Sequence, residues 1–287
     1  MKSILPLVLA LCTVVTVQAG EKSTEVIDII DIDLKELFNF TPQTPPPGPN
    51  SLLGATVLGV EFIGIPAFML NFKGESINNS NPFLNVEENE PYLQDKVWHF
   101  VGAAAKTELN YRLLNHYFSL ENPAAAAGAL SFAFWTLMEC FDGLTSAGFS
   151  VHDQIANTLG MAFGIFNIYY PDIPIRVRIG VESWGRFFSF ARSGFDLSSI
   201  GTDYYSIFKT ELIYVFENDF YAGISLTKGR GKNNHSDRFG ITVGYDIFGS
   251  IEENNNSWWA HTLAYFRNYL TLSVGATYWI DEFDTKL

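Results

Sequence analysis

The chain is poor in cysteine and in positive charge. Its 287 residues include 2 cysteines, and 18 lysines and arginines stand against 31 aspartates and glutamates, for a net charge of −13. No cluster of lysine and arginine occurs, so electrostatic binding to nucleic acid or to an anionic membrane surface has no support. We therefore expect no nucleic-acid partner, and any contact with lipid should be mainly apolar.

The common short catalytic motifs are also missing. The chain contains no Cys-x-x-Cys pair, no His-Glu-x-x-His and no Gly-x-Ser-x-Gly. The segment KGRGKNN, residues 228–234, lacks the spacing of a phosphate-binding loop and lies between two expected strands. These absences exclude most of the chemistry that a motif alone can identify.

The N-terminus has the pattern of a secretory signal. Lys2 is followed by an apolar run over residues 4–17, and Val-Gln-Ala at 17–19 is typical of a cleavage site. Residues 1–19 are therefore predicted to be a signal peptide, and the protein is expected to be exported to the periplasm or outer membrane. Its removal leaves Cys140 as the remaining cysteine, which excludes an intramolecular disulfide.

Three regions of different composition follow. Residues 20–50 are acidic and then proline-rich, as in a tether, and residues 51–170 have a helical pattern. Within this apolar multi-helix domain we expect helices at 92–118, 123–141 and 151–169, the last two with start signals at Asn122-Pro123 and Ser150. The apolar run at 52–70 is interrupted by Glu61 and Pro66, which favours packing against other helices over crossing a membrane.

From residue 171 to 287 the pattern changes to that of an antiparallel β region. Short β-branched and aromatic segments alternate with turns such as END and GKNNHSD. Alternating apolar and small or polar residues fit an outer-membrane sheet or small barrel-like region, and they equally fit a half-buried soluble sheet. The predicted fold class is therefore α+β, with helices first and an antiparallel sheet after them.

The expected helices carry polar residues at spacings that place each set on one face. The sets are Asp95, His99, Lys106 and Asn110; Glu139 and Asp142; and Asp153 and Asn157. Structural roles are an alternative, because Asp95 can complement a helix dipole and Asp153 can cap a helix. A cleft shared by the helices would bring the sets together.

These residues also carry a family resemblance. The segments YLQDKVWHF and MECFDGLTSAGFSVHDQIANTLG resemble the YfiM-like family of bacterial envelope proteins, many of them lipoproteins. The family pattern is Asp-Lys-x-x-His, then Glu-x-x-Asp-Gly, then Phe-Ser-x-x-Asp-x-x-x-Asn-x-x-Gly, and every position is matched. The resemblance covers residues 83–165 and extends distantly to VanZ-like membrane proteins, which are grouped with a helical superfamily proposed to act on lipid phosphate head groups. The lipid-attachment cysteine of many relatives is absent.

The resemblance implies an envelope protein that binds membrane lipid and acts on phosphate-containing head groups. The matching candidates for catalysis are His99, Glu139, Asp142 and Asp153, and those for substrate binding are Asp95, Lys96 and Asn157. His99 is expected to be a general base or nucleophile whose ring is oriented by Glu139 or Asp142. No cofactor is expected, although a divalent metal on Glu139, Asp142 and Asp153 is an alternative that their spacing does not indicate. The competing function is a non-catalytic outer-membrane structural or lipid-binding protein, and the residues identify no protein partner.

Overall fold

A computed structural model provides the structure of the chain. It describes residues 54–56, 58–60, 62, 93–118, 120–145, 148–192, 206–228, 236–246, 265–270 and 274–284. The expected signal peptide at 1–19 and tether at 20–50 lie outside these residues. Of the apolar run at 52–70, only 54–56, 58–60 and 62 are described, and they are helical.

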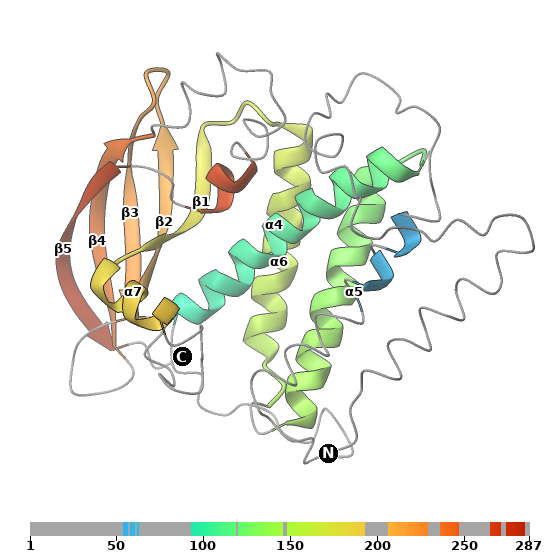
Figure 1. The fold of residues 1–287 in the computed structure, drawn as a ribbon, viewed down its shortest axis with the longest axis horizontal. Helices are drawn as coiled ribbons and strands as arrows, with labels where there is room; N and C mark the ends of the chain where they lie inside the picture. The colour runs from blue at the N-terminus through green and yellow to red at the C-terminus, as the bar shows by residue number, and fades with distance from the viewer. Residues whose placement is uncertain are drawn as a thin grey trace, which may run out of the picture.

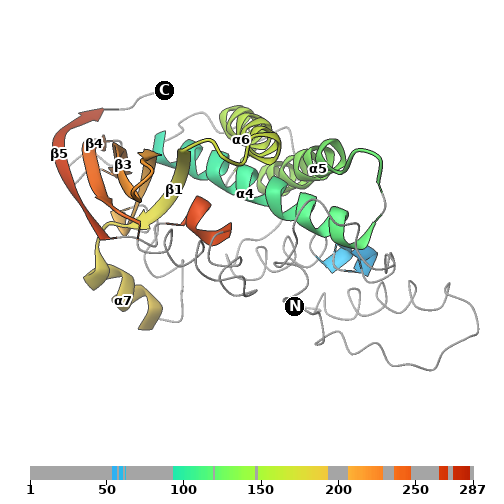
Figure 2. The same cartoon turned by 90° about the horizontal axis from the view of Figure 1, so that it is seen from above.

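Three helices form one side of the molecule, as Figures 1 and 2 show. They are α4 (Leu93–Tyr117), α5 (Pro123–Leu144) and α6 (Val151–Tyr169), which confirms the predicted helices. The predicted start signals are present, because Asn122 Oδ1 accepts from the Ala125 amide and Ser150 Oγ accepts from the Asp153 amide, each at 3.0 Å. Local capping therefore determines where α5 and α6 begin.

Two glycines allow α6 to lie directly on the backbone of α4. A Cβ atom on Gly160 would be 2.1 Å from the Phe100 carbonyl oxygen, and one on Gly164 would be 2.7 Å from that of Ala104. Any larger residue would force the helices apart, because these contacts are with backbone atoms. This close approach brings the polar faces of α4 and α6 together.

Helix α4 also belongs to the core that joins the helices to the sheet. The buried core cluster consists of Val101, Ala104, Leu113, Tyr117, Val177, Tyr265 and Tyr269. The Tyr265 hydroxyl donates to the Ala105 carbonyl at 2.9 Å, and the Tyr269 hydroxyl donates to Glu108 at 2.8 Å. The helical and β regions therefore share buried contacts along α4.

The β region is a five-stranded antiparallel sheet. Its strands are β1 (Ile175–Val181), β2 (Phe208–Val215), β3 (Phe220–Lys228), β4 (Ser236–Tyr245) and β5 (Val274–Asp284). They are adjacent in chain order, with β1 and β5 at the two edges of the described sheet (Figure 1). The predicted α+β class, with helices followed by an antiparallel sheet, is confirmed.

One segment predicted as strand is a helix. The stretch IRVRIGVESWGRFFSF begins with β1 but continues as α7 (Trp184–Arg192). Within α7, Trp184 lies one helical turn from Phe187 and Phe188, with ring centroids 5.6 and 5.8 Å apart. Spacings of three and four residues gather these rings on one helical face, whereas a strand would separate neighbouring side chains.

One face of the sheet is apolar and exposed. The register pairs Leu212 with Ile224, Ile224 with Ile241, and Ile241 with Tyr278, so these side chains form one row across β2 to β5. They are 44, 43, 49 and 76% exposed, respectively. A soluble antiparallel sheet normally turns such a row toward its core.

The opposite face is polar and buried. Arg178 on β1, Glu211 on β2 and Ser225 on β3 are paired in register, and none is more than 1% exposed. Glu211 Oε1 lies 2.7 Å from Lys209 Nζ and accepts from Thr242 Oγ1 at 3.1 Å. The polarity of the sheet is therefore inverted relative to that of a soluble half-buried sheet.

Among the described residues, α5 alone is long and apolar enough to cross a membrane by length and composition, and 39% of its most apolar window is buried. Core helices of soluble proteins can have the same length and composition.

Candidate functional site

Polar side chains from three helices converge at one end of α4. This His99 cluster consists of Asp95, Lys96 and His99 from α4, Glu139 from α5, and Asp153 and Asn157 from α6. A spacing of four residues places Asp95 beside His99 and Asp153 beside Asn157 on their helices. The structure thus brings together six of the seven residues predicted from the sequence.

The His99 ring is held at its Nδ1 atom. Nδ1 lies 3.2 Å from Asn157 Oδ1 and 3.5 Å from Glu139 Oε1. Because Asn157 Nδ2 donates to Glu139 Oε1 at 3.2 Å, the amide oxygen of Asn157 is turned toward the ring and accepts from Nδ1. Nε2 then carries the lone pair of the neutral ring and faces Asp153 Oδ1 at 3.8 Å.

Lys96 provides the positive charge of the cluster. Its Nζ atom is 2.7 Å from Asp153 Oδ1 and 3.1 Å from Asp95 Oδ2, and the residue is 7% exposed. Burial lowers the pKa of Lys96, but the Asp95 and Asp153 carboxylates outweigh this effect and hold the pKa above its ordinary value. Lys96 therefore remains an ammonium ion that links α4 to α6.

The seventh residue, Asp142, lies in the last turn of α5, three residues after Glu139. Its backbone carbonyl accepts from the Thr145 and Gly148 amides, each at 3.0 Å, and closes the α5–α6 connection. Gly148 has a φ of 87°, which favours glycine. The sequence predicts that Glu139 or Asp142 orients the His99 ring. In the structure the nearest partner of Nδ1 is Asn157 Oδ1 at 3.2 Å, and Glu139 Oε1 follows at 3.5 Å.

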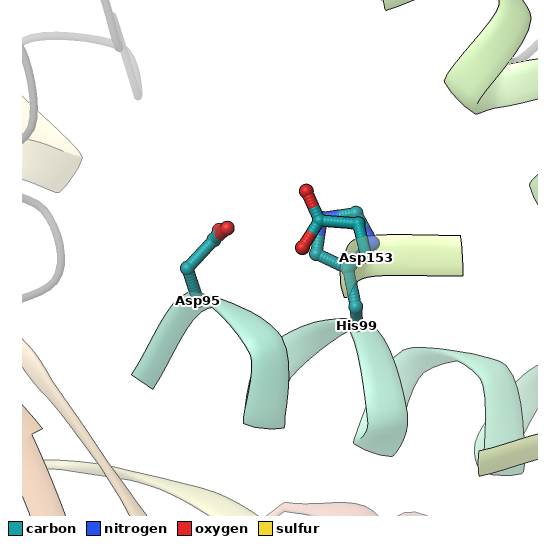
Figure 3. Close-up of side chains that lie close together, drawn as sticks. All are labelled: Asp95, His99 and Asp153. Carbon is teal, nitrogen blue, oxygen red and sulfur yellow. The ribbon is translucent and has the colours of Figure 1, made fainter. Parts of the chain in front are cut away.

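Asp95, His99 and Asp153 lie close enough together to hold a metal ion. Each offers one ligand atom, and the three atoms lie within 4.8 Å of one another. Figure 3 shows Asp95 and His99 rising from α4, with the Asp153 carboxylate beside the imidazole. This set shares only Asp153 with the metal alternative considered from the sequence, which used Glu139 and Asp142.

Burial dominates the acid–base behaviour of the carboxyl groups. The pKa of Glu139 is raised to about 8, first by burial and then by the negative charges of Asp153 and Asp142, against hydrogen bonds from Asn157 and the Ser150 backbone. Burial also raises the pKa of Asp153, although Lys96 and, when its ring is protonated, His99 act in the opposite direction. Glu139 is therefore largely protonated at neutral pH.

Glu139→Gln is expected to stabilise the protein increasingly as the pH rises from 5 to 8. The folded state holds the Glu139 proton up to about pH 8, whereas the carboxyl group of an unfolded chain loses it near its ordinary pKa of 4.5. Wild-type stability should therefore fall across this window, and the neutral glutamine should remove about 2–4 kcal/mol of that loss. Urea unfolding at pH 5, 6.5 and 8 measures the difference. Glu217→Gln, in an exposed turn, is the control, and an equal pH dependence in wild type and Glu139→Gln would contradict the prediction.

Trp135 is a neighbour of His99 that was not among the candidates predicted from the sequence. Its ring centroid lies 5.6 Å from that of His99, and it precedes Glu139 by four residues on α5. That spacing was a usable signal, because residues four apart share a helical face. The aromatic ring covers one side of the imidazole and limits its contact with water.

An apolar surface lies on the outer side of the same end of α6. Val151, Ile155 and Leu159 repeat every four residues and are 51, 52 and 58% exposed. They line a depression of about 270 Å³, together with Phe149, Gln154 and Thr158. The first turns of α6 therefore present an apolar face outward and the cluster residues Asp153 and Asn157 inward.

Comparison of the chain with protein-family models, curated proteins and solved structures found no match.

Proposed function

We propose that the protein is an exported cell-envelope protein that binds a membrane lipid and acts on the phosphate of its head group through the His99 cluster. The observation that carries the proposal is the convergence of His99, Glu139, Asp153 and Asn157 from three helices within hydrogen-bonding or near hydrogen-bonding distance. The resemblance to YfiM-like proteins supports the lipid phosphate as the substrate class.

The reactive atom in this proposal is His99 Nε2. Asn157 holds the proton on Nδ1, so Nε2 of the neutral ring can accept a proton from water. The water oxygen then forms a bond to phosphorus, the ester P–O bond breaks, and the leaving oxygen takes the proton from the imidazolium ion. Lys96 and Asp153 lie on the Nε2 side, where the ammonium group offsets the charge of the carboxylate.

The apolar stripe of α6 supports a lipid over a free phosphate ester. Val151, Ile155 and Leu159 are more than half exposed. A contiguous group of exposed aliphatic side chains often marks a surface that binds a lipid or another apolar partner. They lie on the same turns of α6 as Asp153 and Asn157. The stripe and the cluster lie on opposite faces of α6, so acyl chains packed against the stripe would hold the lipid at the end of α6 that carries the cluster.

His99→Ala is expected to lower the turnover of lipid phosphate esters by about 100-fold or more, because general-base catalysis contributes at least that much. The measurement is the release of product from phospholipid and isoprenoid-phosphate substrates in detergent micelles. The matched control is His152→Ala, which removes an exposed histidine of α6 outside the cluster. Full turnover by a folded His99→Ala variant would show that the catalytic role is wrong, and circular dichroism checks the fold.

The second candidate is a non-catalytic outer-membrane protein, and the inverted polarity of the sheet favours it. An apolar outward row opposite a buried row of charged and hydroxyl side chains is the pattern of transmembrane strands. The row Leu212, Ile224, Ile241 and Tyr278 would face lipid. The two candidates are compatible, since the sheet could hold the helical part at the membrane.

Wild-type protein is expected to fractionate with the outer membrane and to float with phosphatidylcholine vesicles in a density gradient. Ile241→Lys should reduce the floated fraction by about tenfold or more, because a lysine on a lipid-facing strand costs about 2–4 kcal/mol near the middle of a bilayer. Asn218→Lys adds the same charge in the exposed β2–β3 turn and should float like wild type. Recovery of wild type as a soluble periplasmic protein that does not float would rule out the membrane role.

A further inference from the structure

Two of the three residues that could hold a metal ion already contact a cation. Asp95, His99 and Asp153 place their ligand atoms within 4.8 Å of one another. The Lys96 ammonium group lies 2.7 Å from Asp153 Oδ1 and 3.1 Å from Asp95 Oδ2. One nitrogen therefore contacts both carboxylates that a metal ion in this position would use.

A metal ion and the ammonium group cannot occupy the cluster together. Metal–oxygen distances are about 2.0–2.6 Å, so an ion bound to Asp95 and Asp153 would lie within a few ångströms of Lys96 Nζ. Two cations at that separation repel each other strongly in a buried site. The cluster must therefore hold one or the other.

The side chain of Lys96 is well suited to remain in place. The residue is 7% exposed, and Asp153, its closer partner, is 5% exposed. Removal of the ammonium group would leave two neighbouring carboxylates with His99 beside them, which is a costly arrangement without a compensating cation. This set of one imidazole and two carboxylates from two helices would then be available to a metal ion.

We propose that Lys96 is the resident cation of a divalent-metal-type site formed by Asp95, His99 and Asp153, and that loss of its ammonium group converts the cluster into a binding site for Zn²⁺. Lys96 is thus a positioning residue, which holds Asp95 and Asp153 in place and determines which cation the cluster contains. The inference concerns the cluster used in the proposed function, but it depends on the contacts of Lys96 and the spacing of Asp95, His99 and Asp153, and not on catalysis.

The test is binding of Zn²⁺ alone to the full chain without a polyhistidine tag, measured by calorimetry. Lys96→Ala should bind one equivalent at least about tenfold more tightly than wild type. The double variant Lys96→Ala/Asp153→Asn should lose this gain, because it lacks one ligand. Lys106→Ala, which removes another buried lysine from α4, should bind Zn²⁺ no better than wild type.

Folding provides a second measurement, because Lys96→Ala leaves the carboxylates unbalanced. If this variant unfolds without metal, Zn²⁺ should restore its helical circular dichroism and a chelator should reverse the recovery. Lys96→Gln keeps a long polar side chain without the charge and should also gain Zn²⁺ binding. The inference is overturned if neither variant binds Zn²⁺ more tightly than wild type, or if wild type binds one equivalent as tightly as Lys96→Ala. Since no lipid is present, this result is independent of whether His99 catalyses turnover.

Discussion

Gly160→Ala should lower the free energy of unfolding by about 3 kcal/mol, even though alanine is the better helix former by about 1 kcal/mol. The added methyl group would meet the Phe100 carbonyl oxygen at 2.1 Å and the Phe100 Cα atom at 2.9 Å. Backbone atoms cannot rotate away, so α6 must shift from α4. Chemical denaturation measures the loss.

Gly185→Ala is the matched control, because a Cβ atom on Gly185 of α7 meets nothing within 4 Å. It should be neutral or slightly stabilising. The Gly160 change should also weaken the His99 cluster, since Asp153 and Asn157 approach α4 from the same helix. A Gly160→Ala variant as stable as Gly185→Ala would mean that the helices are not held at this distance.

Arg178→Met should destabilise the protein by about 3–5 kcal/mol, as expected when one partner of a buried ion pair is removed. Arg178 and Glu211 are both 0% exposed, and Arg178 Nε lies 3.2 Å from Glu211 Oε2. The guanidinium group also lies 4.5 Å above the Tyr221 ring. Methionine would fill part of the volume but would leave Glu211 with less compensating charge. Equilibrium unfolding in urea measures the change.

Two further variants test the cause of that loss. Arg186→Met replaces an exposed arginine of α7 and should change stability by less than about 0.5 kcal/mol. The double variant Arg178→Met/Glu211→Gln should recover part of the stability, because it removes the undercompensated carboxylate. If the double variant is less stable than Arg178→Met, shape and packing outweigh charge at this position.

The helices were predictable because their signals are local. Asn122-Pro123 and Ser150 act on amides within three residues, so the starts of α5 and α6 could be read without any knowledge of the fold. The incorrect prediction of a strand at α7 also came from a local signal, the aromatic composition of the segment. The aromatic residues of Trp184–Arg192 suit a strand by composition, and only their spacing of three and four residues indicates a helix.

The candidate residues were also predictable, but their roles were only partly so. Polar side chains on apolar helices require partners, so the three sets were expected to meet if the helices shared a cleft. The family resemblance marked His99, Glu139 and Asp153 as candidates for one site. The sequence does not show which atoms meet. Asn157 lies between His99 and Glu139. Asn157 rather than Asp142 contacts the His99 ring because of how α5 and α6 cross α4.

The sequence by itself determined the order of helices and strands apart from α7, the alternation along the strands and the polar residues that need partners, because each depends on neighbours within a few positions along the chain. The tertiary structure decided three other features. Contact at Gly160 sets the spacing of α4 and α6, Lys96 lies between carboxylates of two helices, and the apolar side of the sheet faces outward. These features depend on distances between residues far apart in the chain, which packing alone determines.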